Sequence, residues 1–388
     1  MTKARSPGAP PREALARAGL YAGALLGPFG GGITVAMLPE LGASFDVSPA
    51  TASLSITAYT APFAAVMLVS GTFGERWGRR RTVVVAYLVY LLASVACLLA
   101  TTLPLFLAAR ALQGAANAFT TPLLLAAVAA AAPPQRLGRV LGWFGSMQAA
   151  GQTTAPLVGG LAAEVDWRFA FAGVAAVAAV LAATGIPAEG AAAPAAQRPS
   201  LRTAWQPVVL RAGLVAAVGW GCLAGLNFLV ALRLEEEFGV GSGTRGLLLT
   251  GLGVVGLLTA RLVGGGVDRI GARRSVLLGA AIGVLVVLGV GLAPVVWLVG
   301  VIWALGGVAT QLVLVGVNAM VLGSVAQNPG GAMSVVQAVR FSGAALSPVA
   351  ITPVYHAEPV AGFVLPAVLL AVGVPALLPR PPRPSPSP

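Results

Sequence analysis

The chain is a succession of long apolar runs separated by short polar segments. The runs are about 18–25 residues long, which is the length an α-helix needs to cross about 30 Å of hydrocarbon. Ten-residue strands of alternating hydrophobicity, which would indicate a barrel, are not visible. The pattern predicts an all-α membrane protein with twelve spans, at residues 17–39, 50–70, 82–101, 104–130, 139–162, 168–187, 208–232, 245–263, 275–293, 295–322, 332–354 and 360–379.

Composition supports this prediction and excludes a soluble domain. Apolar residues make up 57% of the 388 residues and charged residues 9%, with a mean hydropathy of +0.88, whereas about a quarter of a soluble domain is charged. The first run is longer than the apolar core of a removable signal peptide and has no convincing cleavage site after it. Cys97 and Cys222 fall inside predicted spans, where packing is the expected role.

The net charge of +12 would suggest a nucleic-acid partner in a soluble protein. Here most basic residues lie in alternate connecting segments on the side of the N-terminus, and only Arg168, Arg233 and Arg245 are expected in the opposite loops. Because basic residues accumulate on the cytoplasmic side, both termini are expected in the cytoplasm. We therefore expect a multi-pass protein of the plasma (inner) membrane, with the lipid bilayer and no nucleic acid as partner.

One charged segment occurs twice. Gly71–Thr82 reads GTFGERWGRRRT, and Gly264–Ser275 reads GGGVDRIGARRS, a shift of 193 positions from Gly71 to Gly264. The same shift aligns ALQG at Ala111–Gly114 with ALGG at Ala304–Gly307. Two matches at one shift predict two pseudo-symmetric six-helix bundles.

The expected domain boundaries follow this duplication. An Ala- and Pro-rich segment in the middle is expected to be a cytoplasmic linker, and the Pro-rich end a disordered tail. The predicted units are a cytoplasmic segment at 1–16, the N-terminal bundle at 17–187, the linker at 188–207, the C-terminal bundle at 208–379 and the tail at 380–388.

The repeated segment resembles a motif of the major facilitator superfamily. Gly71–Arg81 is similar to the pattern Gly-x-x-x-Asp-Arg-x-Gly-Arg-Arg/Lys between helices two and three, with Glu75 in place of Asp. RALQG at Arg110–Gly114 is similar to the Arg-x-x-x-Gly element of helix four in proton-linked members. The resemblance implies the fold of twelve-helix carriers and transport by alternating access.

A second resemblance narrows the branch to drug/proton antiporters. Helix five is similar to their pattern Gly-x8-Gly-x3-Gly-Pro-x2-Gly-Gly, with Ala155 in place of the glycine before the proline, and DWRFAF at Asp166–Phe171 resembles the start of their helix six. The matching helix-five residues are Gly142, Gly151, Pro156, Gly159 and Gly160. Their joint spacing favours an exporter over an importer.

The repeated charged segments are the expected gate. Glycines allow close helix approach, and an acid near a helix N-terminus is stabilised by the helix dipole. The resemblance implies a latch from Glu75 to helix eleven near Gly331. The expected gating residues are Gly71, Glu75, Arg76, Gly78, Arg80, Gly264, Asp268, Arg269, Gly271 and Arg273. The alternative for the arginines is that they anchor the protein at the lipid headgroups.

Polar residues inside the predicted spans are the candidates for a substrate cavity, because each is costly in hydrocarbon unless it faces a cavity or a partner. Arg110 could instead reach outward to the headgroups, whereas Arg340 lies near the bilayer midplane. Tryptophans such as Trp220 are expected mainly to anchor or pack. The candidate cavity residues are Arg110, Gln113, Asn117, Gln148, Gln152, Asn227, Gln311, Gln337 and Arg340.

The proton-coupling residue is less clear. Every acid lies in a predicted loop or at a span end, so no midmembrane carboxylate is visible. Glu40 and Glu164, at the outer ends of helices one and five, are the best candidates and would titrate against Arg110. Both are alternatively solvated cap residues.

The favoured function is export of a small, moderately hydrophobic compound, such as a drug or antibiotic, with protons as the coupling ion. The alternative is an importer or facilitator of an anionic metabolite that uses Arg110 and Arg340. An enzyme is not expected, because no nucleophile or His/Asp/Glu cluster is visible. We expect no cofactor, no metal and a monomer.

Overall fold

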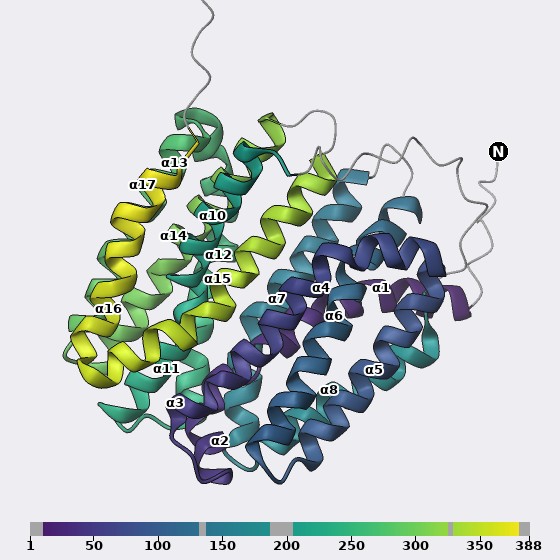
Figure 1. The fold of residues 1–388 in the computed structure, drawn as a ribbon, viewed down its shortest axis with the longest axis horizontal. Helices are drawn as coiled ribbons and strands as arrows, with labels where there is room; N and C mark the ends of the chain where they lie inside the picture. Colours follow the sequence, from purple (N-terminus) through teal and green to yellow (C-terminus); the bar gives the residue numbers. More distant parts are fainter. Residues whose placement is uncertain (1–10, 132–136, 187–204, 325–328, 380–388) are drawn as a thin grey trace, which may run out of the picture.

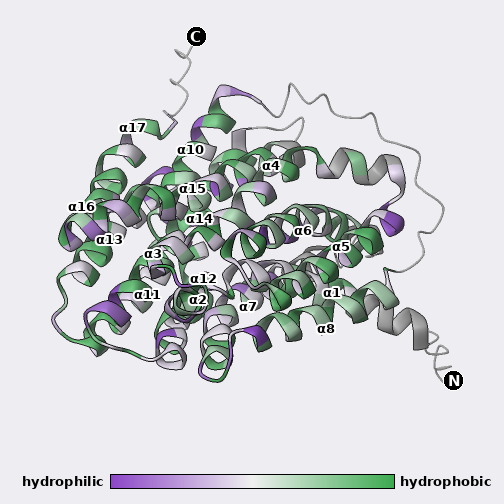
Figure 2. Ribbon diagram, turned by 60° about the horizontal axis from the view of Figure 1, so that its bottom comes forward, coloured by the Kyte–Doolittle hydropathy of each residue, from purple (hydrophilic) through white to green (hydrophobic). Residues whose placement is uncertain are grey.

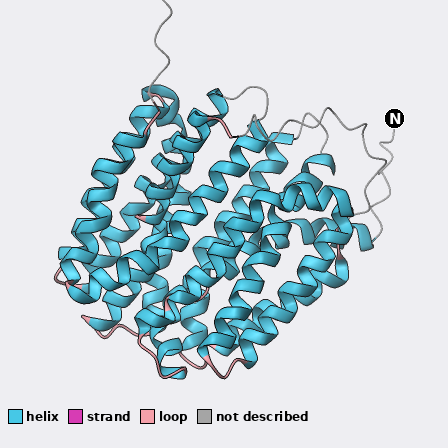
Figure 3. Cartoon of the chain, viewed as in Figure 1, coloured by secondary structure: helices cyan, strands magenta, loops and turns pink. Residues whose placement is uncertain are grey.

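The computed structural model describes residues 11–131, 137–186, 205–324 and 329–379. Over these residues the chain is helical, without strands, as Figure 3 shows. Ten predicted spans coincide with helical stretches long and apolar enough to cross a membrane. The other two, 139–162 and 168–187, coincide with α7 (Leu137–Ala163) and the shorter α8 (Arg168–Thr184). The prediction of an all-α membrane protein is confirmed.

The first span is interrupted. α1 (Pro11–Gly32) ends in a run of three glycines, which favour helix termination because they cost the most conformational entropy in a helix. A 3₁₀ turn, η1 (Val35–Met37), and a short helix, α2 (Leu38–Ser44), complete the span. The remaining helices of the N-terminal half, besides α7 and α8, are α3 (Pro49–Ala52), α4 (Leu54–Trp77), α5 (Arg79–Leu99) and α6 (Leu103–Ala131).

The C-terminal half repeats this design. Its first span is also broken, into α10 (Pro207–Gly221), a 3₁₀ turn η3 (Ala224–Leu226) and α11 (Asn227–Glu236). The helices that follow are α12 (Ser242–Ile270), α13 (Ala272–Leu292), α14 (Val296–Ser324), α15 (Pro329–Ala357), α16 (Pro359–Val368) and α17 (Val374–Leu377), with a π-helical turn between the last two.

The molecule has an inner and an outer end. The inner end is where Gly78 joins α4 to α5 and Gly271 joins α12 to α13. The outer end holds the connections from α2 to α3 and from α11 to α12, at the bottom of Figure 1. The names follow the orientation that the basic residues predict.

The two single-residue connections have the same backbone geometry. Gly78 has φ 87° and ψ 122°, and Gly271 has φ 86° and ψ 151°. Residues with a Cβ rarely adopt this region. The pair predicted to be equivalent by the shift of 193 positions therefore turns the chain in the same way.

A close helix contact also repeats at this shift. A Cβ at Gly114 on α6 would collide with the carbonyl oxygen of Tyr59 on α4. A Cβ at Gly307 on α14 would collide with the carbonyl oxygen of Leu252 on α12. Tyr59 and Leu252 are themselves 193 positions apart, so the same backbone-to-backbone approach is built in both halves.

The two halves have separate apolar cores. In Figure 1 the N-terminal half (purple to blue) lies beside the C-terminal half (green to yellow). One core contains residues of the N-terminal half alone, and the other is formed by the C-terminal half with Val35, Ala36, Leu38 and Ile56. The interrupted part of the first span thus packs on the opposite half.

The outside of the molecule is apolar, as expected for a surface in lipid. Large side chains such as Leu92, Leu258 and Leu285 are exposed on α5, α12 and α13. In Figure 2 hydrophobic residues run along the helices, and hydrophilic ones gather mainly near their ends. The start of the chain, most of the predicted linker and the predicted tail lie outside the described residues, so those boundaries stay predictions.

The close approach at Gly114 can be tested. We expect Gly114→Ala to destabilise the protein by about 1–3 kcal/mol, since the methyl group forces α4 and α6 apart. Thermal unfolding in detergent, followed by tryptophan fluorescence, measures the effect. The control is Gly145→Ala on α7, where nothing lies within 4 Å of the added Cβ and better helix propensity should leave stability unchanged or raised. Equal stability of both variants would contradict the contact.

Candidate functional site

The halves meet through two helix pairs, α4 with α15 and α7 with α12. In the first pair, the Thr57 hydroxyl donates to the Ala345 carbonyl oxygen over 2.6 Å. The rings of Phe63 and Phe341 stand edge to face with centroids 4.9 Å apart. The first contact lies in the outer part of these helices, and the second lies near their middle.

The pair of α7 and α12 is packed through glycines. A Cβ at Gly160 would collide with the Ser242 backbone, and a Cβ at Gly246 with the Pro156 carbonyl oxygen. A Cβ at Gly253 would collide with the Thr153 side chain. These contacts again lie towards the outer end, so close packing there depends on residues without side chains.

The helix-five motif therefore serves two contacts. Gly160 and Pro156 face α12, whereas a Cβ at Gly151 would collide with a backbone carbonyl group of α1 and a Cβ at Gly159 with that of Ile33, just after α1. The surroundings of Gly142 lie outside the described residues. The structure places the motif between the two helices that adjoin α7, and its link to export stays a prediction.

Towards the inner end, the described glycines of α7 and α12 have open space around them. Nothing lies within 4 Å of a Cβ at Gly264, Gly265 or Gly266 on α12, or at Gly145 on α7. Within the described residues, the contacts recorded between the halves thus cluster at the outer end.

The predicted gate lies in this inner region. Asp268 and Arg269 are exposed at the end of α12, and Arg80 is exposed on α5. Arg273 donates to the Pro379 carbonyl oxygen over 2.7 Å, which ties α13 to the end of the C-terminal half. The side chains of Glu75 and Arg76 and the surroundings of Gly71 lie outside the described residues. The gating role of these segments stays a prediction.

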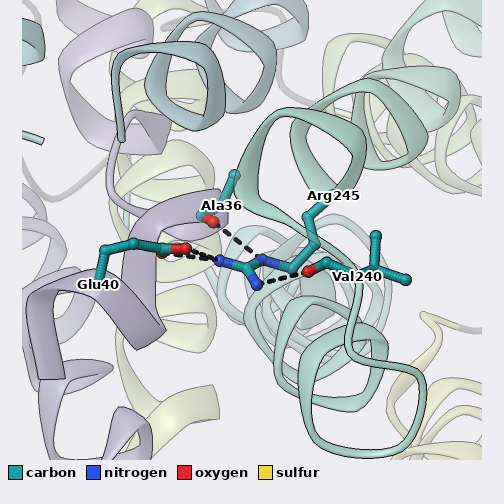
Figure 4. A network of polar contacts seen from close by, with 4 residues as sticks. All are labelled: Ala36, Glu40, Val240 and Arg245. Carbon is teal, nitrogen blue, oxygen red and sulfur yellow. Dashed lines mark hydrogen bonds and ion pairs between the residues drawn. The ribbon is translucent and has the colours of Figure 1, made fainter. Parts of the chain in front are cut away.

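An ion pair joins the two halves at the outer end (Figure 4). Arg245, on the first turn of α12, is 2% exposed and donates through Nη2 to both oxygens of Glu40, over 2.5 and 2.7 Å. Its Nε donates to the Ala36 carbonyl oxygen over 3.2 Å, and its Nη1 to that of Val240 over 2.7 Å. We call this set of four residues the outer latch.

The outer latch corrects two expectations. Arg245 was expected in an outer loop, but it lies inside α12 and is buried. Arg233, also expected in a loop, lies in α11 and donates to Glu237 and to the Ala293 carbonyl oxygen. Hydropathy does not distinguish an exposed arginine from one that is paired with an acid of the other half. In both cases the arginine lowers the mean hydropathy and marks the end of the predicted span.

Arg110 is fully buried in the N-terminal half and its donors point to protein atoms. Nη1 donates to the Gly30 carbonyl oxygen over 2.9 Å and to Gln113 Oε1 over 2.6 Å. Longer contacts, of 3.4 and 3.5 Å, reach the carbonyl oxygens of Ser55 and Gly31. The last carbonyl groups of a helix have no partner within it and attract cations, so Arg110 caps the broken end of α1. Glu40, which was expected to act together with Arg110, pairs with Arg245 instead, and its coupling role stays a prediction.

The equivalent position in the C-terminal half also stabilises a broken span. Trp303 lies 193 positions after Arg110, and its Nε1 donates to Asn227 Oδ1 over 2.7 Å. Asn227 is the first residue of α11, at the break of the seventh span. In each half, a side chain of the fourth span therefore stabilises the break in the first. For Asn227 this contact favours a structural role over a cavity role.

Gln113 and Asn117 are also satisfied within the N-terminal half. Gln113 Nε2 donates to Ser94 Oγ over 2.8 Å, and Asn117 Oδ1 accepts from Thr120 Oγ1 over 2.8 Å. Both side chains are buried. Gln113 thus links Arg110 to Ser94 inside the half, whereas Asn117 bonds Thr120 on its own helix.

Gln148 and Gln152 have a different setting. They lie on α7 between the face that meets α1 at Gly151 and the face that meets α12 at Thr153, and Gln152 is exposed. This face is directed between the halves, where a substrate could be contacted. On α14, Gln311 approaches Gly256 of α12.

Arg340 lines a narrow pocket between α10, α14 and α15, with a cavity volume of about 10 Å³. Its side chain is 8% exposed, and its guanidinium carbon lies 4.3 Å from the Trp220 ring and 4.7 Å from the Phe341 ring. Its Nε and the nearby Gln337 Oε1 are buried without a hydrogen-bond partner among the described residues. Sequence reasoning singled out Arg340 and Gln337 but not the role of Trp220 beside them.

Two similar six-helix halves with polar groups buried in and between them form the architecture of a membrane carrier. The sequence profile of the Major Facilitator Superfamily matches residues 20–348, with a second match at 212–388. The chain belongs to the major facilitator superfamily and is a multi-pass membrane protein of that type.

Curated relatives match over shorter lengths. The "Uncharacterized MFS-type transporter EfpA" of Mycobacterium tuberculosis is 35% identical over 141 residues, which is 36% of this chain and 26% of the relative. The "Drug efflux pump JefA" of the same species is 29% identical over 136 residues, 34% of this chain and 27% of the relative. The "Multidrug resistance protein B homolog", also from that species, is 32% identical over 130 residues, which is 33% of this chain and 24% of the relative. The matches span about a quarter of the length of these relatives.

Solved structures share the fold along nearly the whole chain. A bacterial homologue of the human lysosomal transporter Spinster, in an inward-facing and unoccupied conformation, has a TM-score of 0.72 at 17% identity and covers 96% of this chain and 94% of its own. The human organic anion transporter MFSD10 (TETRAN) has a TM-score of 0.68 at 17% identity, and the match covers 95% of this chain and 100% of the transporter's chain. At this identity the likeness shows the fold.

The outer latch can be tested by distance measurements. Glu40→Gln removes the negative charge and leaves Arg245 buried without a counter-charge, which costs about 3–5 kcal/mol when the pair is well buried. We expect spin labels at Ala43 and Gly241, both exposed beside the latch, to move apart in this variant. Double electron–electron resonance measures the change, and the native thiols of Cys97 and Cys222 are buried from the label.

The matched control is Glu358→Gln. Glu358 is an exposed glutamate at the same end with no ion pair among the described residues, so its variant should keep the original distance. An unchanged distance in Glu40→Gln would refute the latch, and so would an equal change in both variants.

Proposed function

We propose that the protein is a secondary carrier that exports a small, moderately hydrophobic compound, drug-like or antibiotic-like, by alternating access. The observation that carries this proposal is the contact that holds the halves together at the outer end, formed among the described residues by the outer latch and the glycine contacts of α7 and α12. Relatives described as a drug efflux pump and a multidrug resistance protein homologue support export. The helix-five motif agrees with it.

The proposed cycle follows from these contacts. With the outer end held and the inner end less enclosed, a compound from the inner side reaches the face of α7 that carries Gln148 and Gln152. Rocking of the halves would then break the outer latch and close the inner end. The repeated segments at Gly78 and Gly271 lie where that closure would occur.

The basic residues support an orientation with both termini in the cytoplasm of a cell with a plasma (inner) membrane. In that orientation the described conformation faces inward. Because each half encloses its own core, we propose that the monomer is the transporting unit.

Protons are the proposed coupling ion. A proton that drives export must be bound when the outer end closes and released at the inner end. Glu40 is paired with Arg245 while the outer end is closed, so its geometry suits a latch better than a carried proton. Coupling through Glu40 or Glu164 stays a prediction.

An importer or facilitator of an anionic metabolite is the second candidate. It was expected to use Arg110 and Arg340 together. Arg110 is engaged with carbonyl oxygens of the broken helix, which leaves Arg340 as the specific observation in favour of an anion.

Sealed vesicles that contain the purified protein test direction and coupling. With the inner end facing the outside and the lumen acidic, we expect uptake of a fluorescent hydrophobic drug together with proton release, both lost when a protonophore removes the gradient. Protein-free vesicles are the control. Drug uptake without proton movement would contradict antiport, and movement of drug only in the opposite direction would contradict export.

A further inference from the structure

We propose that the pocket between α10, α14 and α15 is a binding subsite for an aromatic organic anion, whose carboxylate pairs with Arg340. This inference rests on the proposed carrier function and specifies a class of substrate for it. We call the pocket the Arg340 subsite.

The first argument is the state of the charge. A buried guanidinium normally has hydrogen-bond partners, as Arg110 and Arg245 do. Arg340 is buried to a similar degree, but its Nε has no partner among the described residues. Such a group is costly in a low-dielectric interior unless something else supplies the acceptor.

The second argument is that the neighbouring helices supply no counter-charge. The sequences of α10, α14 and α15 contain no Asp or Glu. The acid of α4, Glu75, follows Phe63 by twelve positions, about 18 Å along the helix, and Phe63 is the residue that approaches Phe341. The missing negative charge must therefore come from a ligand.

The third argument is the geometry of the guanidinium. Trp220 and Phe341 lie close to it at 4.3 and 4.7 Å, which partly stabilises the cation through the aromatic rings. The N–H groups of arginine project in its plane and match the two oxygens of a carboxylate. The aromatic contacts do not use these N–H groups, which therefore remain available to bind a ligand.

The fourth argument is the lining of the pocket. Most of its walls are apolar, from residues such as Val313, Val317 and Val336, with the polar Thr310 and Asn318 at the side of α14. Its cavity volume of about 10 Å³ in this conformation admits only one end of a compound, the carboxylate, and the ring system would lie at its mouth. Asn318 is less than two turns from Ser324, the inner end of α14, so the pocket extends towards the end that is less enclosed.

The test is binding of three probes of the same shape to the purified protein in zwitterionic nanodiscs. The probes are naphthoate, its neutral amide and the corresponding aromatic ammonium. Hydrogen bonds to a charged group contribute about 1.5–3 kcal/mol, and 1.4 kcal/mol is a factor of ten. We expect naphthoate to bind at least tenfold more tightly than the amide, with the ammonium weakest.

Variants assign this preference to the subsite. Arg340→Met should abolish the advantage of naphthoate over the amide, whereas Arg340→Lys keeps the charge and should retain part of it. Arg261→Met on α12, which removes an exposed arginine outside the pocket, should bind as the original protein does. Size-exclusion chromatography and thermal unfolding confirm that each variant is folded.

Two results would overturn the proposal. One is equal binding of the three probes, or an anion preference that survives in Arg340→Met. The other is loss of naphthoate binding when the nanodiscs contain anionic lipid, which would assign the pocket to a lipid headgroup. If the drug is exported without any preference for anions, the Arg340 subsite is refuted and the proposed function stands. If naphthoate binding depends on Arg340 but no compound is exported, the proposed function is refuted and the subsite stands.

Discussion

The cost of placing an arginine charge in a membrane interior organises this structure. Of the four arginines that are buried among the described residues, three meet this cost in different ways. Arg110 binds the unpaired carbonyl oxygens of a broken helix, and Arg245 binds an acid from the other half. Arg340 has aromatic contacts but no acceptor for its Nε among the described residues. The bonds of Arg110 stabilise the N-terminal half, and the ion pair of Arg245 joins the two halves. The donor of Arg340 is available to a ligand.

The duplication explains why the protein can rock as two bodies. Equivalent glycines, Gly78 and Gly271, make the same turn, and equivalent helix contacts form at Gly114 and Gly307. Each half therefore has its own internal support and its own core. Among the described residues, the contact between them consists mainly of glycine-lined helix faces, apolar packing and a few polar bonds, which can be exchanged without unfolding either half.

Most of the fold could be predicted from the sequence because hydrophobic length and the repeated segment are local signals. The broken spans could not, since three glycines at Gly30–Gly32 indicate flexibility as readily as termination. The pairing of Glu40 with Arg245 could not be predicted either, because it joins residues 205 positions apart in different halves. Arg340 was identified through its depth, but its isolation from every acid depends on which helices surround it.

The central claim is that the outer latch closes one end while the Arg340 subsite opens to the other. A cysteine at Asn318 in sealed vesicles of known orientation tests it most directly, with a maleimide that cannot cross the membrane. The account predicts labelling from the inner side alone in the original protein, and from the outer side as well in Glu40→Gln. Labelling of the original protein from the outer side at an equal rate would contradict the account.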